Sequence, residues 1–487
     1  MISDKIISNW IDGQIQSVEN KEFLDKYNPA TGHKYSSLVN STAEDVKLAV
    51  IAAQKGFNIW SVVTPIERGR ILSELVKLME QTKNDLASIV AIETGKPLND
   101  AIGEVNASIL QGKYFAGEGM RLYGRSLTSG MPGKYSHTVR QPIGIAGLIV
   151  PANTPIANIA WKLFPALICG NSVILKASED APETALRIAE LSKEAGLPDG
   201  VFNVLQGKGD SVGVGIVEST SISIISFTGS TSTGRWIAKT GGERLARVSL
   251  ELGGKNPFVV CDDADLDAAV QWAVLSAFSN AGQRCAAGSR ILIFENIYDQ
   301  FVDKLVEKTK TLKLGVTEGC NLGPVINSRQ QKAILAAIER AKNGGGKVLV
   351  GGKAPQEISL KNGFYIEPTL IDGLTEEDEL STKEVFGPVA TLHRVSSIAH
   401  ALKLANSTEY GLTAAIHTKN VDRAMWFAQR VRSGVVNINI GTFGSEAHMP
   451  FGGMGASGNG TREPGVEALD VYSELKNISF LVRESAI

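Results

Sequence analysis

The segment between Gln141 and Glu251 alternates short apolar runs, rich in β-branched residues, with amphipathic stretches of helical length. Turns rich in glycine and proline separate them. Continuous apolar strands that alternate with helices favour a parallel sheet covered on both faces, the doubly wound arrangement. The pattern therefore predicts an α/β fold, with strands over 144–150, 172–176, 201–205 and 223–227 and helices over 156–168 and 182–195.

A second α/β pattern follows, and helical stretches precede the first sheet. A chain of 487 residues exceeds what one hydrophobic core usually supports, so we expect two or three domains. The further predicted strands are 256–260 and 290–294, and the further helical stretches are 42–57, 65–93, 265–280 and 298–312.

The C-terminal stretch 472–482 partly alternates polar with apolar residues, as a half-exposed strand does. Such a strand either closes the edge of a sheet within its own chain or pairs with another subunit. The alternation by itself favours neither possibility.

Composition excludes several classes of protein. Lys+Arg 49 against Asp+Glu 51 gives a net charge of −2, so no long-range field favours nucleic acid or an anionic membrane. We find no uncharged apolar run of about 18 residues, and the start of the chain lacks the features of a secretory signal. Four scattered cysteines suit neither a disulfide framework nor a metal site. We expect a cytoplasmic protein without a metal; its cysteines are Cys169, Cys261, Cys285 and Cys320.

A thiol and a carboxylate stand in glycine-rich surroundings. Cys285 ends Gly282-Gln283-Arg284-Cys285, whereas Cys169 and Cys261 follow apolar runs and suit buried positions. Glu251 begins Glu251-Leu252-Gly253-Gly254-Lys255 at the end of an apolar run. A thiolate is a strong nucleophile, and a carboxylate can activate the thiol or a water molecule. These residues predict a thiol nucleophile and a general base.

Candidate cofactor residues follow the predicted strands. Lys176 and Glu179 stand at the carboxyl end of a predicted parallel strand, where such a pair can hold ribose hydroxyls; without other motifs, a solvated strand end is the favoured interpretation. The carboxylate would repel a 2′-phosphate and so favours NAD over NADP. Gly229 and Ser230 precede a predicted helix, where backbone N–H groups can bind a phosphate; a helix N-cap is a compatible interpretation.

The segment Gly207–Gly213, which includes Gly209, approaches the Gly-x-Gly-x-x-Gly dinucleotide motif but has one residue too many. A flexible turn explains it better than a nucleotide site does.

Taken together, these residues resemble the aldehyde dehydrogenase superfamily over nearly the whole chain. Each motif is degenerate alone, but their joint order and spacing are highly specific. The motifs are Glu93-Thr94-Gly95-Lys96-Pro97, Pro151-x-Asn153-x-Pro155, Lys176-x-x-Glu179, Phe227-Thr228-Gly229-Ser230-Thr231, Glu251-Leu252-Gly253-Gly254-Lys255, Gly282-Gln283-x-Cys285, Glu384-Val385-Phe386-Gly387-Pro388 and Pro450-Phe451-Gly452-Gly453.

The resemblance implies roles for single residues. Cys285 would attack the aldehyde, Asn153 and the Cys285 N–H would form an oxyanion hole, and Glu251 would activate the water that hydrolyses the thioester. Lys176 and Glu179 would hold the adenosine ribose, Ser230 the pyrophosphate, and Glu384 with Phe386 the nicotinamide ribose. Gly209, Gly229, Leu252 and, with less support, Lys162 complete the expected surroundings of NAD.

The family fold implies an NAD-binding domain (1–121 and 141–252), a catalytic domain (253–455) and a small β oligomerisation arm (122–140 and 470–487). A homodimer or homotetramer is the family expectation.

The sequence departs from the family's commonest forms around the substrate. Ala152 and Thr154 replace frequent Trp and Phe, Gly455 replaces a usual lysine, and Ser445 falls near an often aromatic position. Smaller, more polar groups could admit a bulky or hydroxylated aldehyde. Arg284 could bind an anionic substrate group or pair with a structural carboxylate. The other candidate pocket residues are Asn158, Glu446 and His448.

Three alternatives compete with hydrolytic oxidation. Acylating relatives, which use coenzyme A, generally lack the carboxylate at the position of Glu251. Phosphorylating relatives typically use NADP, which Glu179 disfavours. A catalytically silent scaffold would usually have lost Cys285, Asn153 or Glu251, and all three are present.

Overall fold

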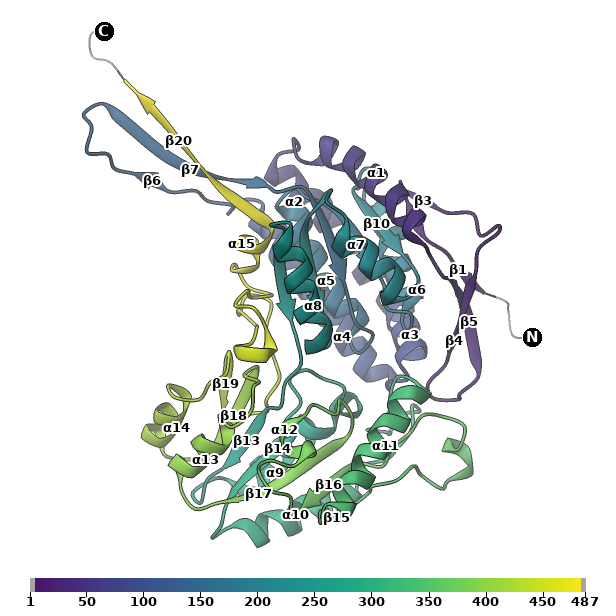
Figure 1. Cartoon of the computed structure of the whole chain (residues 1–487), viewed down its shortest axis with the longest axis vertical. Helices are drawn as coiled ribbons and strands as arrows, with labels where there is room; N and C mark the ends of the chain where they lie inside the picture. The colour runs from purple at the N-terminus through teal and green to yellow at the C-terminus, as the bar shows by residue number, and fades with distance from the viewer. Residues whose placement is uncertain (1–4, 483–487) are drawn as a thin grey trace.

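The structure, a computed structural model, describes residues 5–482. Residues 1–4 and 483–487, which begin the expected NAD-binding domain and end the expected arm, lie outside the described residues. Figure 1 shows two α/β bodies, built from the N-terminal and C-terminal halves of the chain, and a long β arm that projects from the first body. Within residues 5–482 no helix is long and apolar enough to cross a membrane.

A seven-stranded sheet forms the centre of the first body, and its five-stranded core is parallel, as predicted. The central strands are buried along their whole length, which explains their continuous apolar sequence. Two short antiparallel strands extend one edge. In spatial order the strands are β12 (Arg247–Glu251), β11 (Ile222–Thr228), β8 (Ile145–Ile149), β9 (Ser172–Lys176), β10 (Phe202–Leu205), β2 (Trp10–Ile11) and β3 (Gln14–Ile15).

Helices cover both faces of this sheet, which confirms the doubly wound fold (Figure 1). One face carries α1 (Ala43–Trp60), α7 (Val214–Glu218) and α8 (Thr231–Glu243). The opposite face carries α2 (Pro65–Gln81), α3 (Lys83–Thr94), α4 (Leu98–Glu118), α5 (Pro155–Ile168) and α6 (Pro182–Glu194). The helical region expected over 65–93 is thus two helices, separated at Thr82.

A second seven-stranded sheet, parallel except at one edge, forms the other body. Its strands in spatial order are β15 (Lys347–Val350), β16 (Thr369–Asp372), β17 (Val389–Val395), β14 (Arg290–Phe294), β13 (Pro257–Val260), β18 (Thr413–His417) and β19 (Val435–Ile438). Its helices are α9 (Leu266–Phe278), α10 (Tyr298–Lys310), α11 (Ser328–Asn343), α12 (Glu379–Thr382), α13 (Ile398–Ala405) and α14 (Val421–Ala428).

The C-terminal strand pairs within its own chain. After α15 (Ala468–Tyr472), β20 (Ser473–Leu481) runs antiparallel to β7 (Lys134–Pro142), and β6 (Ser126–Leu127) adds a third strand. Every residue of β20 after Ser473 is exposed, so this ribbon presents two uncovered faces (Figure 1). A further small sheet joins β1 (Ile6–Ile7), β5 (Lys34–Val39) and β4 (Phe23–Tyr27).

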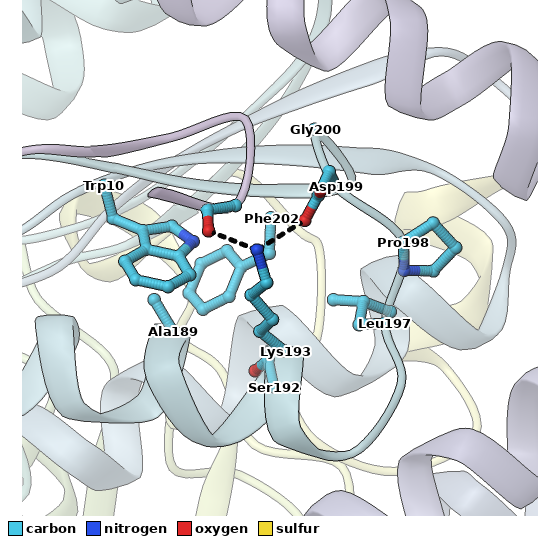
Figure 2. A pocket seen from close by; sticks show the side chains of 10 residues that line it. Trp10, Ala189, Ser192, Lys193, Leu197, Pro198, Asp199, Gly200 and Phe202 are labelled. Atoms are coloured by element: carbon cyan, nitrogen blue, oxygen red, sulfur yellow. Dashed lines mark hydrogen bonds and ion pairs between the residues drawn. The ribbon is translucent and has the colours of Figure 1, made fainter. Parts of the chain in front are cut away.

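Lys193 of helix α6 links this helix to the turn between the antiparallel edge strands of the first sheet. Lys193 Nζ lies between the carbonyl oxygen of Gly13, at 2.7 Å, and Asp199 Oδ1, at 3.2 Å (Figure 2). Gly13 adopts φ +74° in the turn between β2 and β3, a conformation that favours glycine. The small pocket in Figure 2 is therefore a structural joint at the end of α6.

Candidate active site

The candidate residues of the first body follow the carboxyl ends of its parallel strands. Lys176 ends β9 and Glu251 ends β12, while Asn153 and Ser230 lie in the loops after β8 and β11. The strand order reverses between β8 and β11, because the chain adds β9 and β10 on one side and β11 and β12 on the other. Doubly wound sheets bind ligands beside such a reversal.

The backbone before Cys285 forms an unusual left-handed turn. Asn280, Ala281 and Gly282 have φ values of 54°, 54° and 68°. Such values are costly for residues with a Cβ and concentrate at functional sites. A side chain at Gly282 would lie 2.1 Å from the carbonyl oxygen of Gly387, so the turn also requires glycine there. The turn connects helix α9 to Cys285 in a geometry that sequence patterns do not reveal.

Asn153 joins the loop after β8 to this turn. Its Nδ2 donates to the carbonyl oxygen of Gln283 at 2.9 Å. Its own carbonyl oxygen accepts from Asn280 Nδ2 at 3.0 Å and from Lys96 Nζ at 2.9 Å. One hydrogen of the Asn153 side-chain amide is therefore donated to Gln283, which stands two positions before Cys285. The other hydrogen has no acceptor within residues 5–482.

The charge of Glu251 acts on the Cys285 thiol, and both groups have a raised pKa. Burial, followed by the charges of Glu251 and Glu384, raises the pKa of the half-buried Cys285 thiol to about 12. Burial, followed by the charge of Glu463, raises the pKa of Glu251 well above its usual value. Neither carboxylate oxygen of Glu251 has a hydrogen-bond partner within the described chain. An unpartnered buried carboxylate with a raised pKa is a stronger base than a solvated one.

We expect the alkylation of Cys285 by iodoacetamide to be slow at neutral pH. Because only the thiolate reacts and its pKa is raised, the rate should increase by about tenfold per pH unit between about pH 7 and 10. Peptide mass spectrometry measures the modified fraction of Cys285 against time at each pH. A rate that already levels off near neutral pH would contradict the raised pKa.

A buried ion pair that sequence reasoning missed lies next to Glu251. Lys162 Nζ binds Glu463 Oε2 at 2.6 Å, and both side chains are almost fully buried, at 1% and 0% exposure. Ser226 donates to Glu463 Oε1 at 2.7 Å and accepts from Lys162 at 2.8 Å. The charge of Lys162 acts to lower the pKa of Glu251. Nothing in the local sequence distinguishes Glu463 from a surface carboxylate.

The end of β9 carries an acidic and a basic group beside a cavity of about 530 Å³. Lys176 Nζ binds Glu179 Oε2 at 2.8 Å. Although burial acts in the opposite direction, Lys176 holds the pKa of Glu179 below its usual value, so the carboxylate stays ionised. Glu179 and Gly209 both line the cavity, as do two cations that the sequence did not single out, Lys208 and Arg329.

Ser230 caps helix α8 by accepting from Thr233 N at 3.3 Å, and the preceding Gly229 N donates to the carbonyl oxygen of Glu251. The N-cap interpretation of Ser230 is therefore correct, and it leaves the exposed start of α8 open to a phosphate. Leu252 is buried, and its methyl groups fill the space above Gly234 in the same helix. The donors and the cavity at this edge fit the adenosine and pyrophosphate of a dinucleotide.

Glu384 and Phe386 belong to a loop of the second body that reaches the glycines after Glu251. Glu384 Oε1 accepts from Gly254 N at 3.0 Å, and burial raises the pKa of Glu384 to about 7. Phe386 has φ +56°, a strained value for a bulky residue. Gln330, which the sequence did not single out, donates from Nε2 to the carbonyl oxygens of Val385 and Phe386 at 2.9 and 3.2 Å. These bonds stabilise the strained conformation.

The four candidate substrate residues lie in different surroundings. Asn158 uses its amide within the protein, donating to Thr154 O and Oγ1 at 2.9 Å each. Glu446 and His448 are exposed, and neither side chain forms a hydrogen bond or ion pair within residues 5–482. Arg284 lies over the Phe443 ring, with Cζ at 5.0 Å from its centroid.

A doubly wound sheet with a dinucleotide-type carboxyl edge, near a cysteine and a buried carboxylate, is the arrangement of a cofactor-dependent oxidoreductase with a candidate thiol nucleophile. The chain matches the family described as "Aldehyde dehydrogenase family" over residues 15–478. It is 37% identical to the α-ketoglutaric semialdehyde dehydrogenase of Bacillus subtilis over 473 residues, covering 96% of this chain and 97% of the relative. It is 40% identical to aldehyde dehydrogenase 1A1 of Rattus norvegicus over 486 residues, covering 98% and 95%.

Solved structures agree with the sequence relatives. Betaine aldehyde dehydrogenase of Staphylococcus aureus in complex with NAD+ superposes with a TM-score of 0.95 at 34% identity, covering 97% of this chain and 94% of that one. PnpE in complex with nicotinamide adenine dinucleotide gives 0.95 at 38% identity, covering 98% and 97%. The chain belongs to the aldehyde dehydrogenase family, and it oxidises aldehydes with NAD as its cofactor. The expected family and fold are confirmed.

Proposed function

We propose that this aldehyde dehydrogenase works through a covalent adduct on Cys285 and releases a carboxylic acid by hydrolysis. The observation that carries the proposal is the buried Glu251 carboxylate, unpartnered within residues 5–482 and electrostatically coupled to the thiol. A base in these surroundings can take a proton first from the thiol and later from water.

The chain's own groups account for each step. Sγ of Cys285 forms a bond to the aldehyde carbon, and its proton passes to Glu251. The developing negative charge on oxygen is stabilised by the second N–H of the Asn153 amide and by the Cys285 N–H, which makes no hydrogen bond within residues 5–482. Once the adduct has become a thioester and Glu251 has released the thiol proton to solvent, Glu251 takes a proton from the attacking water, the C–S bond breaks and the Cys285 thiolate leaves.

NAD, when bound, accepts the hydride that converts the adduct to the thioester. We propose that Lys176 and Glu179 bind its adenosine ribose, that Ser230 with Gly229 and Gly209 surrounds the phosphates, and that Leu252 packs beside it. Glu384 and Phe386 would orient the nicotinamide ribose. The ionised Glu179 repels a 2′-phosphate and so disfavours NADP, although Lys208 and Arg329 line the same cavity.

We expect Glu251→Gln to separate the two halves of the reaction. The glutamine side chain is nearly isosteric with glutamate but cannot accept a proton, so steady-state turnover should fall by about 10²- to 10⁴-fold if hydrolysis limits the rate. The charge of Glu251 also raises the pKa of Cys285, so the thiol of the variant should ionise to solvent more readily, and rapid-mixing absorbance should still show a burst of NADH. Glu409→Gln, which changes an exposed carboxylate paired with Arg235, is the matched control.

The same assay distinguishes the alternatives. Wild-type turnover in buffer without coenzyme A or phosphate, with the free acid as product, is the expected result. Turnover that requires coenzyme A would replace the hydrolytic mechanism by the acylating one, and turnover that requires phosphate would replace it by the phosphorylating one. Unchanged turnover by Glu251→Gln, with hydrolysis shown to be rate-limiting, would remove Glu251 as the base.

We further propose the division into an NAD-binding domain (1–121 and 141–252), a catalytic domain (253–455) and an oligomerisation arm (122–140 and 470–487). The separate sheets support this division. The exposed apolar side chains of the arm, Tyr135, Leu475, Phe480 and Leu481, support a homodimer or homotetramer in which the arm is covered. All four cysteines are free, which fits the reducing cytoplasm.

The relatives named above act, by their names, on α-ketoglutaric semialdehyde and on betaine aldehyde. Membership of the family therefore leaves the aldehyde open, and the residues around Cys285 must identify it.

A further inference from the structure

The side chain of Arg284 carries a charge that the protein does not pair. Its Nε is buried and has no hydrogen-bond partner, and its guanidinium forms no ion pair with a carboxylate of residues 5–482. The expectation that it pairs with a structural carboxylate is therefore wrong for the described residues. An unpaired cation that has lost part of its hydration is costly unless an anion compensates it.

The nearby acidic groups do not supply this anion. Glu104 and Asp100 interact with Arg284 only at a distance. Glu104 is already the partner of Lys96, and its other oxygen accepts from Ile156 N at the start of α5. Asp100 lies at the exposed beginning of α4 and forms no ion pair with Arg284. The charge of Arg284 is thus available to a ligand.

The surroundings of Arg284 join this charge to the reacting thiol. Arg284 directly precedes Cys285 in the chain, and its guanidinium lies over the ring of Phe443. Phe443 packs with Cys285, Trp161 and Phe451 in one apolar cluster, in which the Trp161 and Phe451 rings are 5.2 Å apart. Stacking on an aromatic ring limits the freedom of the guanidinium while leaving its edge N–H groups free. The thiol therefore has an aromatic wall and one fixed cation beside it.

We propose that the substrate is an aldehyde with a carboxylate at its other end, and that Arg284 binds this carboxylate while Cys285 attacks the carbonyl. This substrate class rests on the proposed function of Cys285. A guanidinium suits a carboxylate because its planar N–H groups match the two oxygens. A single cation balances one negative charge, and the nearby Asp100 carboxylate disfavours a second, so a monoanionic carboxylate suits the site better than a phosphate dianion. The aromatic side chains pack against the short apolar chain between the aldehyde and the carboxylate of the substrate.

The test compares aldehydes of equal length with and without the charge. NADH formation gives kcat/KM for 4-oxobutanoate against butanal and for 5-oxopentanoate against pentanal. Wild-type protein should prefer the carboxylated member of at least one pair by about tenfold or more. Arg284→Met should lower that preference by about 10- to 100-fold, because it removes a charge-assisted hydrogen bond while it retains much of the side-chain volume. Arg284→Lys should restore part of the preference.

A second variant acts in the opposite direction. Asp100→Asn removes a negative charge that Arg284 senses, so it should raise the preference for the carboxylated aldehyde, and added salt should lower the preference of the wild type. Preferences that stay the same in Arg284→Met and Asp100→Asn, or a wild type that favours neutral or phosphorylated aldehydes, would overturn the proposal. Turnover of neutral aldehydes without a charge preference would refute this inference alone. Absence of turnover on every aldehyde, with NAD bound, would refute the proposed function.

Discussion

Cys285→Ala is expected to abolish NADH formation, with a loss of at least about 10³-fold, while binding of NAD persists. Alanine removes only Sγ, and the turn that precedes residue 285 depends on Asn280, Ala281 and Gly282, none of which contacts the sulfur by hydrogen bonds. The loss should therefore be chemical and not structural. Absorbance assays measure turnover, and quenching of tryptophan fluorescence measures the affinity for NAD.

Cys320→Ala is the matched control for this substitution. Cys320 is half-buried like Cys285, but it lies in the segment between α10 and α11, where its Sγ contacts the carbonyl oxygen of Leu314 at 3.5 Å. It should keep full turnover. Activity that survives in Cys285→Ala, or that disappears in Cys320→Ala, would move the nucleophile elsewhere.

Lys162→Met is expected to destabilise the protein by about 3–5 kcal/mol, because it leaves the Glu463 carboxylate buried without its cation. Ser226, Ser249 and Tyr472 would still donate to that carboxylate, but hydroxyl groups do not neutralise it. Replacing both partners, as Lys162→Met with Glu463→Leu, should recover part of the loss. Thermal unfolding followed by circular dichroism, at a fixed protein concentration, measures the change.

A lysine on the surface gives the contrast. Lys304 binds Asp267 Oδ1 at 2.6 Å, a distance equal to that of the buried pair, but Asp267 is 80% exposed. Lys304→Met should change stability by no more than about 0.5 kcal/mol, since exposed ion pairs contribute little. Equal losses in the two lysine variants would show that burial of the Lys162 pair does not determine its effect.

The sequence predicted those parts of the fold whose residues interact with near neighbours or fill a buried layer. The sequence predicts β8, β9, β10 and β11 because central parallel strands are mainly apolar. The antiparallel edge strands β2 and β3 are two residues long and carry no periodicity. The helical sequence pattern runs from α2 into α3 without a visible interruption, and only the backbone conformation of Thr82 separates the two helices.

The candidate site divides in the same way. Glycine-rich surroundings made Cys285 and Glu251 conspicuous, and their chemistry could be stated before the structure. The role of Gln330 depends on two carbonyl oxygens 55 and 56 residues away, and Glu463 pairs with a lysine 301 residues away. Partners so distant leave no local pattern. The left-handed turn at Asn280 and Ala281 could not be predicted either, because Asn is only a weak signal for a positive φ and Ala disfavours it.

Residues 457–463, which follow the last strand of the second sheet, supply hydrogen-bond acceptors and a buried charge to the first body. The carbonyl oxygen of Ser457 accepts from Leu252 N at 3.0 Å, Asn459 Oδ1 accepts from Leu250 N at 3.0 Å, and Glu463 compensates Lys162. During synthesis, β12 with Glu251 is therefore made long before Ser457, Asn459 and Glu463, the residues that interact with this region. A chain that ended before Glu463 and folded in this way would bury the Lys162 cation without its anion. Such chains should be unstable and inactive, because the interior of the first body is complete only once residue 463 has been added.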